Sequence, residues 1–231
     1  MKLFYVFLPF VITSSLLAQS SVEPGLIGSK YVGIGFTKAW NNKNDTSYHG
    51  IDLSINSPIN EYFDFTLGSD LAVQDTEGVP NNVYTDYYGR SVTFPKHNRW
   101  SIGASLGVKV HKEFPIQNNF LKTIDPYFGL GIPLDYYFAT EYDVMEFARY
   151  GYGYSFGAEL QFLGSFSIIP SHSFRNFWAI QDGVTSDKFE RDSYGIKFNY
   201  FLCTNSILQL NYTSEVDTDW NGITLSYLMN M

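Results

Sequence analysis

The sequence places one histidine between two hydroxyl residues, in the tripeptide Ser171-His172-Ser173. An imidazole beside a serine hydroxyl can remove its proton and make the oxygen a nucleophile. On a β-strand, however, adjacent side chains point to opposite faces, so neither serine can meet the imidazole. The geometry therefore favours a structural strand histidine next to Pro170, and we predict no catalytic residue here.

A second candidate is the segment Asp217–Gly222 (DTDWNG), which matches the first half of a calcium-binding loop. The acid that should bind the ion at the twelfth position is replaced by Leu228. Asn-Gly, at the end of the segment, is also a signal for a hairpin turn between two strands. We therefore predict a turn, and we expect no metal site and no cofactor.

The segments expected to connect strands on the outer side are acidic. Solvated charges account for them, and diffuse bridging of anionic lipid headgroups by divalent cations is the functional alternative. These acids are Asp45, Asp75, Glu77, Asp86, Glu141, Asp143, Glu146, Asp182, Asp187, Glu190 and Glu215.

The elements that must position all these residues are strands, and the last one has the clearest pattern. Apolar residues occupy every second place from Ile223 through Leu225, Tyr227 and Met229 to Met231. With a period of two, all five stand on one face of a strand. Such a strand at the edge of a soluble sheet invites aggregation. In an outer-membrane barrel it pairs with the first strand while its apolar face meets lipid, and the pattern predicts that arrangement.

Composition supports the same class. Aromatic residues make up 18% of the chain, and charged residues are only 16% against a usual value of about 25%. Hydrophobic residues reach 45% but are dispersed, which is what a lipid-facing barrel wall requires. The net charge of −8 argues against nucleic-acid binding, which needs clustered Lys and Arg. Cys203 is the one cysteine, so no intramolecular disulfide can form.

The first residues are typical of an export signal. Lys2 precedes an apolar run from Leu3 to Ile12, and the small residues Ala18 and Ser20 occupy the −3 and −1 places before Ser21. We predict a signal peptide over residues 1–20 and a single barrel domain over residues 21–231. The expected location is the outer membrane of a Gram-negative bacterium, as an integral multi-pass protein.

The alternation continues along the chain and predicts an all-β fold, a single up-and-down antiparallel transmembrane β-barrel. Ten strands are expected near residues 31–37, 51–56, 63–73, 100–110, 127–135, 150–162, 166–178, 194–202, 208–213 and 223–231. An even number places both termini on the periplasmic side. Long outer connections are expected at residues 41–47, 74–98, 139–149, 182–192 and 215–221. The connection 111–123 is long for the periplasmic side, so either it carries an insertion or the barrel has eight strands.

The polar face of each strand must look inward, because a charge that faces the bilayer midplane costs several kcal/mol. Two explanations of the inward charges stay open, a hydrogen-bonded plug and solvated lumen residues. We expect the acids and bases to pair across the lumen and to leave little continuous water, so that currents through the protein are small. The predicted inward charges are Asp52, Asp64, Asp70, Asp135 and Glu159 with Lys109, Arg175 and Lys197.

Aromatic residues near the predicted strand ends suit the two membrane interfaces. They would be equally ordinary in the core of a soluble β-sandwich, so they add little by themselves. These residues are Tyr62, Trp100, Tyr127, Trp178 and Trp220.

Two segments, Tyr31–Phe36 (YVGIGF) and Pro126–Gly131 (PYFGLG), resemble strands of the small outer-membrane barrels of the OmpA-type transmembrane domain and their OmpW-like relatives. The resemblance implies contact with outer-membrane lipids and lipopolysaccharide, and recognition of the C-terminal strand by the barrel assembly machinery. The terminal signal of these families is matched from Ile223 to Met229, but the last residue, usually Phe or Trp, is Met231. No peptidoglycan-binding domain follows the barrel, so a wall-anchoring role is not implied.

Two families of barrel enzymes resemble the chain less. Omptin proteases share an Asp-x-Asp pair, here Asp217 and Asp219, but they also need an Asp-x-His dyad, which no histidine of this sequence offers. Lipid A deacylases need His and Ser two residues apart, which the surroundings of His172 do not provide. We therefore expect a non-enzymatic barrel with a structural, surface-interaction or small-solute passage role and an unknown surface ligand. The alternative is an outer-membrane barrel enzyme, either lipid A-modifying or an omptin-like protease.

Overall fold

The computed structural model describes residues 25–43, 46–75, 83–85, 91–93, 99–116, 120–139, 147–162, 165–181, 184–185, 188–216 and 218–231. Ten long strands form its wall, each antiparallel to its neighbours. They are β1 (Tyr31–Asn41), β2 (Thr46–Pro58), β3 (Phe63–Asp75), β6 (Arg99–His111), β8 (Leu121–Ala139), β9 (Phe147–Phe162), β10 (Phe166–Gln181), β12 (Phe189–Cys203), β13 (Ser206–Glu215) and β14 (Trp220–Asn230).

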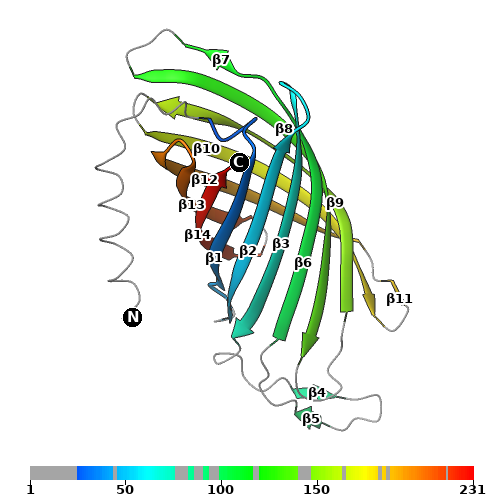
Figure 1. The fold of residues 1–231 in the computed structure, drawn as a ribbon. Helices are drawn as coiled ribbons and strands as arrows, with labels where there is room; N and C mark the ends of the chain where they lie inside the picture. The colour runs from blue at the N-terminus through cyan, green and yellow to red at the C-terminus, as the bar shows by residue number, and fades with distance from the viewer. Residues whose placement is uncertain are drawn as a thin grey trace, which may run out of the picture.

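The wall is a closed barrel (Figure 1). β1 pairs with β2 on one side and with β14 on the other, so the first and last strands join. β9 pairs with both β8 and β10 and completes the ring. Closure gives each of the ten wall strands a paired neighbour on both sides, which is the condition for placing a sheet in lipid. The predicted ten-stranded up-and-down barrel is confirmed.

Of the two explanations for the long connection 111–123, an insertion or an eight-stranded barrel, the structure shows the insertion. After β6 ends at His111, the short strand β7 (Phe114–Pro115) pairs back onto β8. A second short strand, β11 (Val184–Thr185), pairs antiparallel with the end of β10, and β4 (Val83–Thr85) pairs with β5 (Ser91–Thr93) in a separate two-stranded sheet. Among the described residues, no helix is long and apolar enough to cross a membrane.

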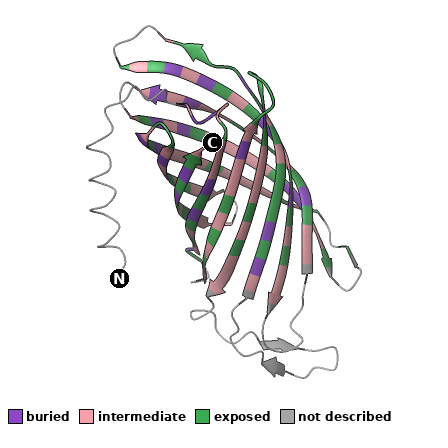
Figure 2. Ribbon diagram, viewed as in Figure 1, coloured by how far each residue is buried: buried purple, intermediate pink, exposed green. Residues whose placement is uncertain are grey.

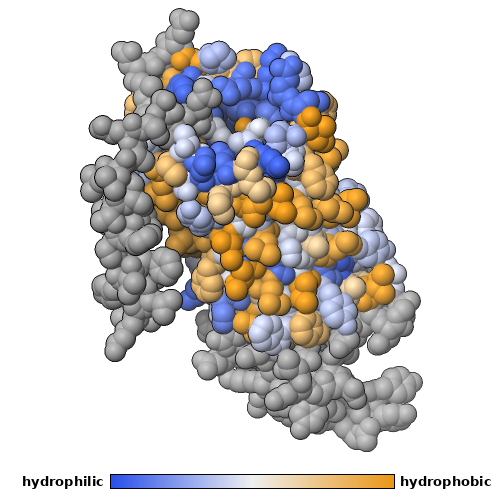
Figure 3. Space-filling view, viewed as in Figure 1, coloured by the Kyte–Doolittle hydropathy of each residue, from blue (hydrophilic) through white to orange (hydrophobic). Residues whose placement is uncertain are grey.

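Side chains alternate between the two faces of the wall, as predicted (Figure 2). Large apolar side chains cover the outside, and Figure 3 shows hydrophobic residues gathered over the middle of the visible wall. Their exposure to water would be unfavourable for a soluble protein. Examples of these exposed residues are Ile34, Phe36, Leu53, Leu71, Ile102, Leu106, Leu130, Ile132, Leu210, Leu225 and Met229.

Two aromatic residues predicted for the membrane interfaces lie inside the barrel instead. Tyr127 packs against the buried apolar cluster of the lumen. The ring of Trp220 lies 4.9 Å from that of Tyr48, and both residues have the parity of the inner face. The prediction was wrong for these two because aromatic rings near strand ends suit either face.

Several strands begin earlier than the sequence indicated, and in two of them the earlier start places a charged residue inside the strand. β9 starts at Phe147 and β12 at Phe189, so Arg149 and Asp192 belong to strands and not to the predicted connections 139–149 and 182–192. A charged residue does not end a strand when the neighbouring strands still satisfy its backbone groups. The predicted signal peptide, residues 1–20, and most of the connection 74–98 lie outside the described residues.

Candidate functional site in the barrel lumen

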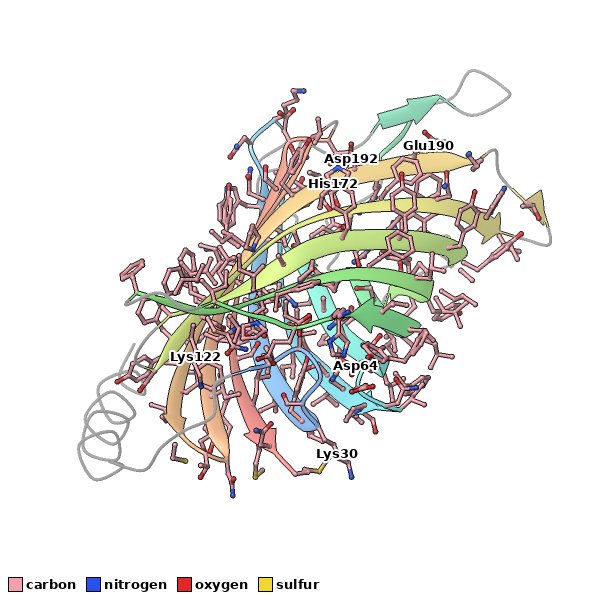
Figure 4. The ribbon with its side chains drawn as sticks, turned by 90° about the horizontal axis from the view of Figure 1, so that it is seen from above. Lys30, Asp64, Lys122, His172, Glu190 and Asp192 are labelled. Atoms are coloured by element: carbon pink, nitrogen blue, oxygen red, sulfur yellow. The ribbon has the colours of Figure 1, made fainter. Side chains whose placement is uncertain are left out.

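The chain segment before β1 turns into the barrel. Gly25–Lys30, here called the terminal plug, lies at the terminal end of the barrel, where β1 begins and β14 ends (Figure 4). The carboxylate of Glu159 on β9 accepts hydrogen bonds from the backbone N–H groups of Leu26 (2.9 and 3.1 Å) and Ile27 (2.9 Å). The hydroxyl of Ser167 donates a further bond to it at 2.5 Å. Glu159 is 0% exposed, so its charge is held by fixed donors in place of water.

A second carboxylate holds the other half of the terminal plug. Asp64 on β3 accepts a hydrogen bond from the backbone N–H of Gly28 at 3.0 Å and another from the side chain of Asn56 at 3.1 Å. The same amide nitrogen of Asn56 donates to the carbonyl oxygen of Ser29 at 2.7 Å. Asp64 and Asn56 are both fully buried, so these contacts replace hydration that neither residue can reach.

Lys109 supplies positive charge to this cluster, and the His111 ring lies within it. The His111 ring lies between two carboxylates, 3.1 Å from Asp125 and 3.5 Å from Asp64. Lys109 interacts electrostatically with the three acids of the cluster. Gly28 adopts a φ of 78°, and a Cβ at this position would lie 2.8 Å from the His111 ring. Both constraints require glycine, so the histidine and the turn of the terminal plug depend on each other.

Apolar side chains add a second kind of contact between the terminal plug and the barrel wall. Leu26 and Ile27 form a buried cluster with inward residues of four strands, and Tyr31 and Tyr127 pack against it. Burying two aliphatic side chains stabilises the terminal plug by about 3–5 kcal/mol before the entropy of ordering it is subtracted. The four wall residues are Ile169 on β10, Phe201 on β12, Ile207 on β13 and Leu228 on β14.

A charged layer crosses the lumen nearer the loop end of the barrel, opposite the terminal plug. Arg149 donates a hydrogen bond to Asp135 at 2.7 Å, and Arg191 donates one to Glu215 at 3.1 Å. Both guanidinium groups also lie over the ring of the buried Phe177, with ring-centroid distances of 5.2 Å for Arg149 and 5.9 Å for Arg191. These pairs fix the inner wall at this level.

The inward placement of all eight predicted charges is observed, but their predicted pairing is not. Among the described residues, no carboxylate lies within 4.0 Å of Lys109, Arg175 or Lys197, whereas Arg149 and Arg191, which the sequence reading assigned to connections, do form ion pairs. The reason lies in strand register, which places Asp135 directly opposite Arg149 and places Arg175 opposite Gly153 and Arg191.

We predict that the barrel is more stable with both charges of the Asp135–Arg149 pair, or with neither, than with one of them alone. Asp135→Ala should destabilise the barrel by about 2–3 kcal/mol, because it leaves a largely buried guanidinium without its partner. The double variant Asp135→Ala with Arg149→Met should recover most of this loss. Urea unfolding of the refolded protein measures both, and a double variant as unstable as the sum of the single ones would contradict the prediction.

His172 faces outward, as its strand position requires. Its ring lies against Phe156 (5.0 Å) and Tyr194 (4.7 Å), and its Nε2 atom lies 2.5 Å from Asp192 (Figure 4). The adjacent Ser173 points into the lumen, where its hydroxyl is 2.7 Å from that of Ser193. The structure therefore keeps the histidine and the flanking serines on opposite faces, as the sequence predicted.

The candidate calcium segment lies at a chain reversal. Residues 216–219 connect β13 to β14, and Asp219 adopts a φ of 54° and forms an ion pair with Lys43. The predicted turn is present, although Asn221 and Gly222 belong to β14 and do not form it. Asp217 lies outside the described residues. In the described part of the chain, no group of three or more His, Cys, Asp or Glu residues is arranged to hold a metal ion.

The terminal plug is the feature that the sequence reading missed. The pattern Gly25-Leu26-Ile27-Gly28 directly before the first strand was available as a signal, because two apolar residues between glycines can form a compact buried turn. The acids that bind it, Asp64 and Glu159, were correctly predicted to lie in the lumen. Their partners are backbone N–H groups, which every residue except proline has, so the sequence does not distinguish them.

No protein-family model matches the sequence, and no curated protein matches it. Solved structures with a similar fold are outer-membrane β-barrels. They include the translocator domain of the autotransporter NalP from Neisseria meningitidis, with 9% identity over 96% of this chain and 93% of that chain and a TM-score of 0.46. The outer membrane protein OprG from Pseudomonas aeruginosa has 10% identity over 88% and 96% and a TM-score of 0.41. Such distant similarity assigns no activity to this chain.

Proposed function

We propose that this protein is a non-enzymatic barrel of the Gram-negative outer membrane, whose lumen is closed at the periplasmic end by the terminal plug. The outer wall is the observation that supports a membrane location. Apolar side chains such as Leu130 (59% exposed) and Ile132 (54% exposed) cover the outside of a closed barrel. Water disfavours such a surface, whereas hydrocarbon requires it.

The terminal plug supports a structural or surface-interaction role over free passage of solutes. Buried hydrogen bonds and an apolar cluster hold it at one end of the lumen, with contacts to inward residues of strands on all sides. A pathway through the barrel would require this segment to move. Contact with lipopolysaccharide and outer-membrane lipids and assembly through the C-terminal strand are part of this proposal.

Cell fractionation tests the proposed location. We expect the protein in the outer-membrane fraction, with gel mobility that changes on heating because a closed barrel resists detergent unfolding at room temperature. Recovery as a soluble periplasmic protein with heat-independent mobility would refute the proposal.

An enzymatic role is the second candidate, and the outward ion pair of His172 and Asp192 is the observation that favours it. A carboxylate that orients an imidazole is the supporting half of a nucleophilic site, and this one faces the expected lipid side. Mass spectrometry of lipid A with and without expression is the direct test. An unchanged lipid profile, together with uncleaved basic peptides, would leave this candidate without support.

A further inference from the structure

Three glycines lie side by side across the inner wall of the barrel. Gly107 on β6 pairs with Gly131 on β8, which pairs with Gly153 on β9. Thr66 on β3 and Arg175 on β10 are the next partners at the two ends of this row. Because glycine has no side chain, the wall is hollowed between Thr66 and Arg175, and we call this hollow the glycine trough.

The neighbouring row towards the terminal plug is also made of small residues. Lys109 pairs with Gly129, which pairs with Ser155, and Ser155 pairs with Ser173. The two rows and Ser105 line a cavity of about 170 Å³. A space of this size holds several water molecules or one small organic ion. Lys109 and Arg175 stand three strand spacings apart, roughly 14 Å between their backbones, so the cavity has a cation at each end.

In the described part of the chain neither cation forms an ion pair, although Asp64, Asp125 and Glu159 attract Lys109 from a distance. Among the described residues, no carboxylate lies within ion-pairing distance of Arg175 or Lys109, in contrast to the paired Arg149 and Arg191. Lys197 adds a third positive charge, close enough to Lys109 for mutual repulsion. A bound anion would relieve this repulsion. Asp70 attracts Arg175 from a distance, so the net attraction for an anion is moderate and sensitive to salt.

The position and chemistry of Arg175 suit the binding of an oxyanion. Its side chain lies against Gly153, where a Cβ would be 3.0 Å from Arg175 Cγ. A larger residue at position 153 would therefore crowd the arginine side chain. A guanidinium binds two oxygens of one carboxylate, sulfate or phosphate group at once, and nearby hydroxyls can donate further bonds. We propose that the glycine trough binds a small free oxyanion, with Arg175 as its main contact and the hydroxyls of Thr66, Ser105 and Ser155 around it.

Calorimetric titration of the refolded full chain in detergent micelles with sodium sulfate, at constant ionic strength against chloride, tests this site. We expect saturable binding by the unmodified protein and at least a tenfold loss of affinity for Arg175→Gln. Ser105→Leu should cause a similar loss, because the larger side chain fills the trough while every charge remains. Lys38→Gln is the matched control, since Lys38 has the outward parity on β1 and the variant also removes one positive charge.

Three outcomes would overturn the proposal: no saturable binding by the unmodified protein, a loss for Lys38→Gln equal to that for Arg175→Gln, or unchanged binding by Ser105→Leu. Heat-dependent gel mobility of each variant confirms that its barrel is folded. Titration with acetate and inorganic phosphate then separates carboxylate from phosphate preference. Because the measurement uses purified protein, its failure is distinguishable from failure of the proposed membrane location.

Discussion

Replacement of Glu159 by glutamine is expected to release the terminal plug and to raise the ionic current through the barrel. The carboxylate accepts hydrogen bonds from two consecutive backbone N–H groups and from Ser167. Hydrogen bonds to a charged group are worth about 1.5–3 kcal/mol each, so losing the charge should weaken the plug by about 3 kcal/mol. That corresponds to a ~150-fold larger released population. In planar bilayers, the unmodified protein should give small or undetectable currents and the variant clearly larger ones.

The matched control is Glu190→Gln, which makes the same chemical change at an exposed carboxylate on β12. Glu190 pairs with Lys188 and has no contact with the terminal plug, so its variant should conduct like the unmodified protein. Equal currents for Glu159→Gln and the unmodified chain would show that the plug does not limit conduction. Large, stable currents from the unmodified protein would show an open lumen and would favour a porin role.

Leu130→Arg is expected to destabilise the barrel in lipid vesicles by about 2–4 kcal/mol. Leu130 lies in the middle of β8, points outward and is 59% exposed in the absence of lipid. An arginine at the bilayer midplane must be dehydrated or must deform the membrane, which accounts for the cost. On a soluble protein the same exposed substitution would change stability by less than about 0.5 kcal/mol. Urea titration in vesicles, followed by tryptophan fluorescence, measures the difference.

Val216→Arg serves as the control for this experiment. Val216 is also exposed, but it lies in the connection between β13 and β14, outside the strands. Arginine near an interface costs about 0–1 kcal/mol, so the two variants should differ by at least ~2 kcal/mol. Similar stabilities for both would mean that the middle of the wall does not contact hydrocarbon.

The sequence contained most of the information on the wall. Side chains alternate between the two faces of a strand, so the spacing of Leu130, Ile132 and their counterparts determined which residues face outward. The same periodicity placed Asp52, Asp64 and Glu159 in the lumen. It also predicted that β14 would pair with β1, because a strand with one fully apolar face needs a partner on both edges in lipid.

Strand ends and charge partners were less predictable. Arg149 falls within the predicted connection 139–149, although it lies in β9 and pairs with Asp135. Conversely, Arg175 was expected to pair, but it forms no ion pair with any described residue. Alternation specifies a face but not a level along the barrel axis. Which charges meet is decided by the register of ten strands, and a shift of two residues preserves every face while it exchanges every partner.

By itself, therefore, the sequence determined the fold class, the closure of the barrel and the inward or outward direction of the wall residues. Only the tertiary structure decided that Gly25–Lys30 folds into the lumen and that three glycines from different strands align into a trough. The physical reason is that periodicity is a local property of a strand. The plug is held by backbone N–H groups that donate to side chains 36 to 133 residues away. The trough exists only where three separate strands bring their glycines to one level.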